Sequence, residues 1–140
     1  MEYLARCHCG VLSATYRTAL QTALWPVRAC QCAFCRAHCA LSTSDPDGLL
    51  IYSASDLSLL RRYRFGTRSA DFMLCGACGV FLGAVMTQGL QRWGVLNLRA
   101  LQPVPADLSA PQPMQYEAES IGNRTERRTA RWTPIGADSI

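Results

Sequence analysis

The fold of this chain is decided by a stretch in its second half, Ala70-Asp71-Phe72-Met73-Leu74-Cys75-Gly76-Ala77-Cys78-Gly79-Val80-Phe81-Leu82-Gly83-Ala84-Val85-Met86. Ala70, Phe72 and Leu74 alternate up to the first cysteine, and the apolar run 80–86 leaves the second, so we expect two strands. A Cys-x-x-Cys-Gly motif between two strands is a specific signal of a zinc knuckle. The stretch therefore predicts a hairpin that presents two thiols to a metal ion.

A second pair of thiols lies near the start of the chain, in Cys7-His8-Cys9-Gly10. Gly10 suits a tight turn, because glycine accepts a positive φ without steric cost. Strands are expected on both sides of the turn, over Glu2–Arg6 and over Val11–Arg17, where apolar and polar residues alternate. Cys7 and Cys9 fall on one side of this hairpin. A structural zinc ion takes four protein ligands, so this pair needs two more from elsewhere in the chain.

Four further cysteines fall within ten residues, in Cys30-Gln31-Cys32-Ala33-Phe34-Cys35-Arg36-Ala37-His38-Cys39. Thiolates are soft ligands that suit zinc, and a Cys-x-Cys-x-x-Cys run can wrap three sulfurs around one ion at ~2.3 Å. A structural site fills the fourth position with another protein ligand, whereas a catalytic site keeps it for water or substrate. The occupant of the fourth position therefore decides between a structural and a catalytic role.

Length and composition indicate one globular domain over residues 1–140, since the chain is 49% apolar and 17% charged. No run reaches the roughly 18 apolar residues of a membrane span, and residues 1–6 lack the start of a secretory signal. We therefore expect a soluble, cytoplasmic protein that does not contact membranes. In a reducing compartment, its eight cysteines are expected to bind metal rather than to form disulfides.

The rest of the chain adds short strands. Leu49–Tyr52 and Trp93–Leu98 are apolar strand candidates, and Ser42–Gly48 is rich in the residues of loops. Ala23–Val27 is expected as a strand whose proline suits a sheet edge. The apolar residues of Leu57–Phe65 fit partly the spacing of a helix and partly the alternation of a strand, and we favour a strand. About six to eight short strands with no internal repeat predict a mostly β, single-domain fold.

All fourteen basic residues are arginines, and the net charge is +4. Guanidinium donors match carboxylates and phosphates, so a small anionic ligand fits this composition. A nucleic-acid surface is usually more basic, which argues against nucleic acid as a partner. Segment 103–140 is rich in proline and arginine, and its arginines are expected to form a solvated face: Arg124, Arg127, Arg128 and Arg131.

The three cysteine motifs, taken in order, resemble a known family. Cys7-x-Cys9-Gly10, Cys30-x-Cys32-x-x-Cys35-Arg36 and Cys75-x-x-Cys78-Gly79 are similar to the motifs of the glutathione-dependent formaldehyde-activating (GFA) family, also called the centromere protein V/GFA domain. That family has an Mss4-like β fold stapled by zinc knuckles. The resemblance covers roughly residues 3–100, whereas segment 103–140 matches only loosely. It implies two zinc ions, one in a closed structural site held by Cys7, Cys9, Cys75 and Cys78, and one in an open site held by Cys30, Cys32 and Cys35.

The resemblance also implies an activity. The named reaction of the family adds glutathione to formaldehyde and gives S-hydroxymethylglutathione, a carbon–sulfur lyase-type reaction. Cys30, Cys32 and Cys35 would then be the catalytic zinc ligands, and the partner would be a small-molecule thiol with glutathione as the expected co-substrate. Three thiolates give a Zn²⁺ site a net charge of −1, which makes it a poor generator of hydroxide but still able to hold a thiolate.

Several arginines are candidates for binding the two carboxylates of glutathione. Arg36 comes first because it directly follows the third thiol. Four others are further candidates, although an ordinary surface position is the more frequent role of such residues: Arg61, Arg62, Arg64 and Arg68.

The chain departs from the family after Arg36, where a small Ser-Gly-like pair is common and this chain has Ala37-His38-Cys39. If Cys39 lies one helical turn after Cys35 and binds the metal, the second site is closed. The alternative is that Cys39 is a small buried apolar side chain, which leaves the site open. His38 is a candidate general base or a partly exposed turn residue, and His8 is expected to point outward.

Two functions therefore remain open. The first is a zinc enzyme that acts on a thiol adduct of formaldehyde or a related electrophile, and the second is a non-catalytic zinc-stabilised β module that binds a protein or nucleic acid. An open three-thiol site in a pocket with convergent arginines favours the enzyme. A closed four-cysteine site, or the lack of a pocket, favours the module.

Overall fold

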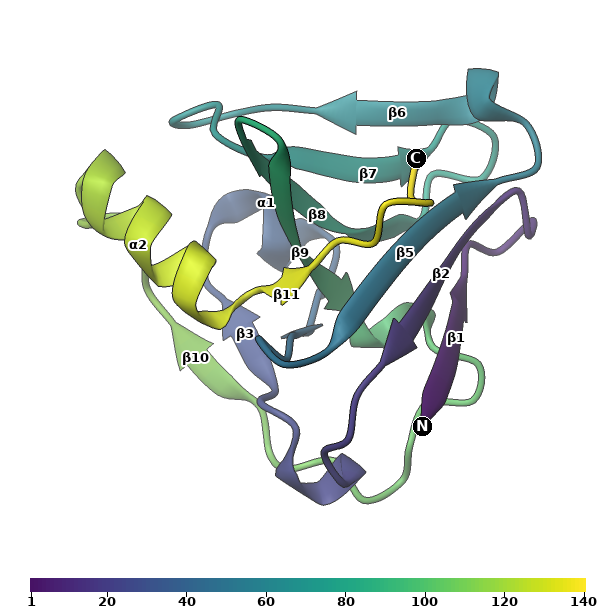
Figure 1. Ribbon diagram of the computed structural model, residues 1–140, viewed down its shortest axis with the longest axis horizontal. Helices are drawn as coiled ribbons and strands as arrows, with labels where there is room; N and C mark the ends of the chain where they lie inside the picture. Colours follow the sequence, from purple (N-terminus) through teal and green to yellow (C-terminus); the bar gives the residue numbers. More distant parts are fainter.

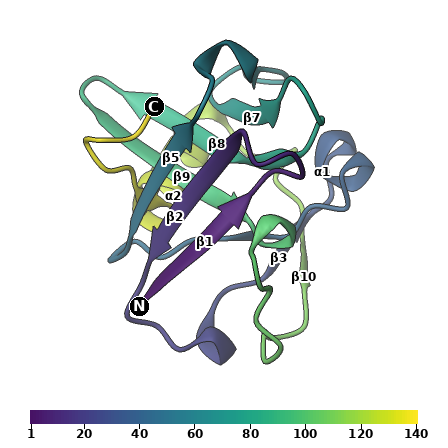
Figure 2. The same cartoon turned by 90° about the vertical axis from the view of Figure 1, so that its right-hand side faces the viewer.

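The computed structural model describes residues 1–140 and contains a small β-sheet of three antiparallel strands. In sheet order these strands are β1 (Glu2–Arg6), β2 (Leu12–Arg17) and β5 (Leu49–Ala54). Figure 2 shows the three side by side near the N-terminus. Leu12, Ala14 and Tyr16 of β2 are buried, as the alternating pattern of this strand predicts.

A larger sheet holds the remaining strands and lies across the middle of the molecule in Figure 1. Its order is β10 (Gln112–Met114), β3 (Arg28–Cys30), β4 (Ser42–Thr43), β9 (Gln91–Asn97), β8 (Phe81–Gln88), β7 (Asp71–Cys75) and β6 (Leu60–Tyr63), with β11 (Thr133–Pro134) paired to β9 outside this path. Only β10 and β3 pair in parallel, and the other pairs are antiparallel.

The helices are short. Helix α1 (Ala33–Ala37) follows β3, and helix α2 (Ile121–Arg131) lies on the side of the molecule opposite to β1 in both ribbon views. Three single 3₁₀ turns complete the structure: Thr22–Leu24, Leu57–Leu59 and Leu98–Ala100. Neither α-helix has the length and apolar character that crossing a lipid bilayer requires.

The main hydrophobic core joins the two sheets. Side chains from the small sheet, such as Tyr16 and Leu50, share one buried cluster with Met73, Leu82 and Leu96 from the large sheet. A smaller cluster lies on the other face of the large sheet and includes Trp132, the residue that follows α2. Both faces of this sheet are therefore covered in the region of β8 and β9.

A bulge in β8 divides its side chains between the two clusters. The register between β7 and β8 skips Leu82, and such an extra residue turns the following side chains relative to the pleat. Leu82 and Val85 pack into the main core, whereas Ala84 and Met86 join the smaller cluster with Trp132. The face that carries Ala84 is the one on which the cavity described below is built.

Most of the predicted strands are confirmed, and the chain is a mostly β single domain. The strand predicted over Ala23–Val27 is wrong, because residues 22–24 form a 3₁₀ turn and the next strand begins at Arg28. The strand favoured over Leu57–Phe65 is confirmed only for Leu60–Tyr63. The predicted loop at Ser42–Gly48 begins with the two-residue strand β4.

Helix α2 was not expected from the sequence. Its first turn is capped by Ser120, whose side-chain oxygen accepts a hydrogen bond from the backbone N–H of Asn123 at 3.1 Å. The helix ends before Trp132, and Pro134 follows two residues later. No apolar stripe marks it in the sequence, because the side chain that it buries is Arg128.

Candidate functional site

Two hairpins bring four cysteines together into what we call the four-thiol site: Cys7, Cys9, Cys75 and Cys78. The first two lie at the β1–β2 turn and the last two at the β7–β8 turn, so the site connects the small sheet with the large one. Gly10 and Gly79 follow these pairs with φ of 83° and 80°, as tight knuckle turns require.

The sulfur positions fit a tetrahedral metal ion. Cys9 Sγ lies 3.7 Å from Cys7 Sγ and 3.6 Å from Cys75 Sγ. Four sulfurs placed ~2.3 Å from a central zinc ion are about 3.8 Å apart, which matches these distances. Backbone N–H groups also point at the sulfurs, since Leu12 N–H donates to Cys7 Sγ at 3.2 Å and Cys78 N–H donates to Cys75 Sγ at 3.4 Å. Such donors stabilise thiolates, the form that binds metal.

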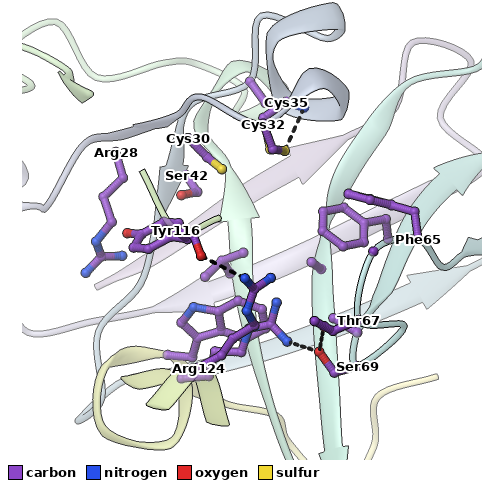
Figure 3. A pocket seen from close by; sticks show the side chains of 18 of the residues that line it. Arg28, Cys30, Cys32, Cys35, Ser42, Phe65, Thr67, Ser69, Tyr116 and Arg124 are labelled. Carbon is purple, nitrogen blue, oxygen red and sulfur yellow. Dashed lines mark hydrogen bonds between the residues drawn. The ribbon is translucent and has the colours of Figure 1, made fainter. Parts of the chain in front are cut away.

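A second cluster, which we call the three-thiol site, consists of Cys30, Cys32 and Cys35. Cys30 ends β3, Cys32 caps the N-terminus of α1, and Cys35 lies inside that helix. The backbone N–H of Cys35 donates to Cys32 Sγ at 3.4 Å (Figure 3). The ligand atoms of each site lie within 4.8 Å of one another. The donor set and spacing of the three-thiol site therefore also fit a zinc ion, with one coordination position left over.

The aromatic side chain of Phe34 anchors this site to the large sheet. Phe34 stands between Cys32 and Cys35 in the sequence. Its ring contacts the rings of Phe65, Phe72 and Phe81 at centroid distances of 5.2, 4.8 and 5.1 Å. Aromatic contacts of this kind stabilise by about 1 kcal/mol each beyond the burial of area. Phe34 thus packs the short helix α1, which buries none of its residues completely, against the large sheet.

Within the three-thiol site the pKa of Cys30 is lowered and the pKa of Cys35 is raised. The neighbouring Cys35 thiol, with a smaller contribution from the positive charge of Arg127, lowers the pKa of Cys30 to about 6. The same contact with Cys30, together with burial, raises the pKa of Cys35. A lowered pKa favours the thiolate form of Cys30, which is the form that binds a cation.

Cys39 lies outside both thiol clusters. Helix α1 ends at Ala37, and Cys39 has a positive φ of 48°, so its side chain does not continue the helical face of Cys35. It is exposed, and the prediction of a small buried side chain is therefore wrong. His38 is the C-cap residue of α1, its ring lies tilted against the Phe34 ring at a centroid distance of 4.5 Å, and it remains partly exposed, whereas His8 is exposed as expected.

A cavity of about 130 Å³ lies beside the three-thiol site, and all three cysteines line it. In Figure 3 the thiols form one side of this cavity, Arg28 and Tyr116 a second side, Phe65 a third, and Arg124 lies across from the thiols. Its apolar wall is the outer face of the large sheet with the end of α2: Phe72, Phe81, Ala84, Val95 and Trp132. The cavity thus combines a candidate metal centre with an apolar wall.

Four arginines also line this cavity: Arg28, Arg124, Arg127 and Arg128. Arg127 forms two hydrogen bonds with the Glu119 carboxylate at 2.8 and 2.9 Å and lies over the Tyr116 ring, with 3.7 Å from its central guanidinium carbon to the ring centroid. Arg124 donates to the Tyr116 carbonyl oxygen at 2.7 Å. Positive charge therefore predominates across from the thiols.

Arg128 is the most deeply buried of these arginines, with 7% of its surface exposed. It donates to the Ser69 hydroxyl at 2.8 Å and lies over the Trp132 ring at 4.7 Å. Burial, with repulsion from Arg127 and Arg124, lowers its pKa to about 10. The solvated face predicted for the C-terminal arginines is therefore wrong for Arg124, Arg127 and Arg128, and holds only for Arg131.

The arginines expected from the sequence lie elsewhere. Arg36 is exposed and lines a separate hollow of about 170 Å³, together with Cys30, Cys35, Cys39 and Arg99. The other four candidates are exposed and line neither space: Arg61, Arg62, Arg64 and Arg68. Sequence reasoning missed the arginines of the main cavity, although the spacing 124, 127, 128 and 131 has the period of one helical face.

The chain was compared with known proteins. No protein-family model matches it, and no curated protein matches it either. The crystal structure of a Rhodobacter sphaeroides protein from a structural genomics programme is similar, with a TM-score of 0.59 and 25% sequence identity over 79% of this chain and 99% of that chain. That protein is described by its source alone. The likeness therefore concerns the fold, and the function has to be argued from the site.

Proposed function

We propose that this protein is a zinc-dependent carbon–sulfur lyase-type enzyme of the GFA type, which acts on an adduct between a thiol, such as glutathione, and formaldehyde or a related small electrophile. The observation that carries the proposal is the position of the three-thiol site in the wall of a cavity that arginines also line. A metal held there by Cys30, Cys32 and Cys35 has three protein ligands and a free position that faces space for a substrate.

Two features favour the enzyme over a non-catalytic zinc module. Cys39, the residue best placed in sequence to close the site, lies outside the cluster. The three-thiol site also connects no distant segments, since its ligands lie within six consecutive residues, whereas the four-thiol site joins two sheets. A metal at the three-thiol site would therefore contribute less to folding than one at the four-thiol site.

For this reaction the protein has to hold the thiol as a thiolate and to bind the anionic part of the substrate. A zinc ion held by three thiolates would supply a position that keeps an incoming thiol as thiolate. In the synthetic direction the thiol gives up its proton, its sulfur attacks the carbonyl carbon of formaldehyde and a C–S bond forms. The carbonyl π pair moves to oxygen, which accepts one proton, so that the net reaction transfers the thiol proton to the new hydroxyl group. The arginines hold the anionic part of the substrate, and the apolar wall keeps water away from the reacting atoms.

Exchange measurements on zinc-loaded protein test this proposal. In a mixture of ¹³C-formaldehyde and glutathione, magnetisation-transfer NMR should show faster interconversion of hydrated formaldehyde and the S-hydroxymethyl adduct in the presence of the protein. Cys32→Ser should lose this acceleration and about one metal ion, whereas Cys39→Ala should keep both. If the wild-type protein gives no acceleration with glutathione or with smaller thiols, the proposal is wrong.

A further inference from the structure

The size of the cavity limits which part of a substrate it can enclose. Its volume is about 130 Å³. For comparison, an engineered apolar cavity of about 150 Å³ in another protein holds one benzene molecule. A group of roughly six heavy atoms therefore fits between the thiols and the arginines, whereas a tripeptide such as glutathione would have to leave most of its atoms outside.

The arginines across from the thiols lack a complete set of partners. The Nε atoms of Arg124 and Arg128 are buried and have no hydrogen-bond partner. Arg124 forms an ion pair with the Glu119 carboxylate at 3.8 Å, and Glu119 also binds Arg127, whereas Arg128 forms no ion pair with any carboxylate. Arg128 is therefore a buried guanidinium without a counter-ion, which is costly, so an anion bound beside it would stabilise this arrangement.

From size and charge together, we infer that the thiol substrate of this site is a compact mercaptocarboxylate. Its carboxylate binds Arg124 and Arg128, its short carbon chain packs on the apolar wall beside Trp132, and its sulfur reaches the three-thiol site. This inference rests on the proposed function and narrows it, because it assigns the cavity to a small anionic thiol rather than to the whole of glutathione.

Calorimetric titration of zinc-loaded protein tests the inference without turnover. We choose three thiols: 3-mercaptopropionate, the neutral 2-mercaptoethanol of similar length, and glutathione. Charge-assisted hydrogen bonds to a carboxylate correspond to an affinity gain of at least about tenfold. We therefore expect 3-mercaptopropionate to bind at least about tenfold more tightly than 2-mercaptoethanol, and more tightly than glutathione.

Two variants and a matched control locate the subsite. Arg128→Gln should reduce the affinity for 3-mercaptopropionate about tenfold and leave the affinity for 2-mercaptoethanol unchanged. If Arg128→Gln does not fold, Arg124→Gln, at a less buried position, should show the same loss of affinity for 3-mercaptopropionate and the same unchanged affinity for 2-mercaptoethanol. Arg131→Gln removes the same charge from the same helix at an exposed position outside the cavity and should change neither affinity.

The outcomes separate this inference from the proposed function. Equal affinities for the charged and the neutral thiol, or tighter binding of glutathione, would overturn the inference whatever the catalytic result. Charge-dependent binding that both cavity variants abolish would support it. If such binding is found while no thiol accelerates the exchange of formaldehyde, the proposed function fails and the anionic subsite remains.

Discussion

Replacing one ligand of each thiol site should have unequal effects on stability. We consider Cys78→Ser in the four-thiol site and Cys32→Ser in the three-thiol site. A metal ion that joins two segments acts as a cross-link, and its effect on the unfolded chain grows with the length of the loop that it closes. Cys9 and Cys75 are 66 residues apart, whereas Cys30 and Cys35 are separated by only five.

The loop lengths give an order of magnitude. The chain-entropy relation for cross-links yields about 4 kcal/mol for a loop of this longer length and about 2 kcal/mol for the shorter one. In a domain of this size 1 kcal/mol corresponds to roughly 3 °C in melting temperature. Cys78→Ser should therefore lower the melting temperature by about 12 °C or more, and Cys32→Ser by about half as much. Metal–sulfur bonding energy adds to both values, so the difference between the variants is the firmer expectation.

Thermal unfolding followed by circular dichroism, combined with metal analysis of the same samples, measures both quantities. Wild-type protein should contain about two zinc ions per chain, and each variant about one. Two results would refute the reasoning. Cys78→Ser could keep its metal and its melting temperature, which would remove the four-thiol site as a structural metal site. Alternatively, Cys32→Ser could be as destabilising as Cys78→Ser, which would make the three-thiol site a structural element and weaken the enzyme proposal.

Three further variants test other parts of the structure. Cys39→Ala should keep both metal ions and change the unfolding free energy by less than about 0.5 kcal/mol, since this side chain is exposed and outside the clusters; loss of one metal ion on metal analysis would show that Cys39 is a ligand. Gly83→Ala should destabilise by about 3 kcal/mol in denaturant titration, because an added Cβ would lie 2.0 Å from the Tyr52 hydroxyl oxygen; an unchanged midpoint would contradict the packing of the two sheets. The hydrogen bonds from Arg127 lower the pKa of Glu119 below its usual 4.5, so their stabilisation is present above pH 4.5 and is lost as the pH falls through the lowered value. Glu119→Gln should accordingly lower the melting temperature at pH 7 more than at pH 3, and an equal difference at both pH values would argue against this ion pair.

Local patterns in the sequence determined the strands and the metal motifs. In β2 the side chains alternate between core and outside, and this period of two is visible in the residues themselves, whereas β7 is apolar on both faces and the structure places Met73 and Cys75 in the main core. The cysteine pairs at 7 and 9 and at 75 and 78 could be recognised because a knuckle needs two thiols at short spacing and a glycine in the turn. These features depend only on neighbouring residues.

Only the tertiary structure decided which charged side chains face the thiols. Arg124 and Arg128 are about ninety residues from the three-thiol site in the sequence, and they reach the cavity because Trp132, at the end of α2, packs on the outer face of the large sheet. Arg36 directly follows Cys35 and nevertheless lies outside the main cavity, because successive residues of a helical turn point about 100° apart. Arginines are mostly exposed in folded proteins, so a sequence rule places them in solvent. This rule fails for Arg128, which is buried. The motif thus specified the candidate metal ligands, whereas the packing of distant segments specified what a metal bound there would face.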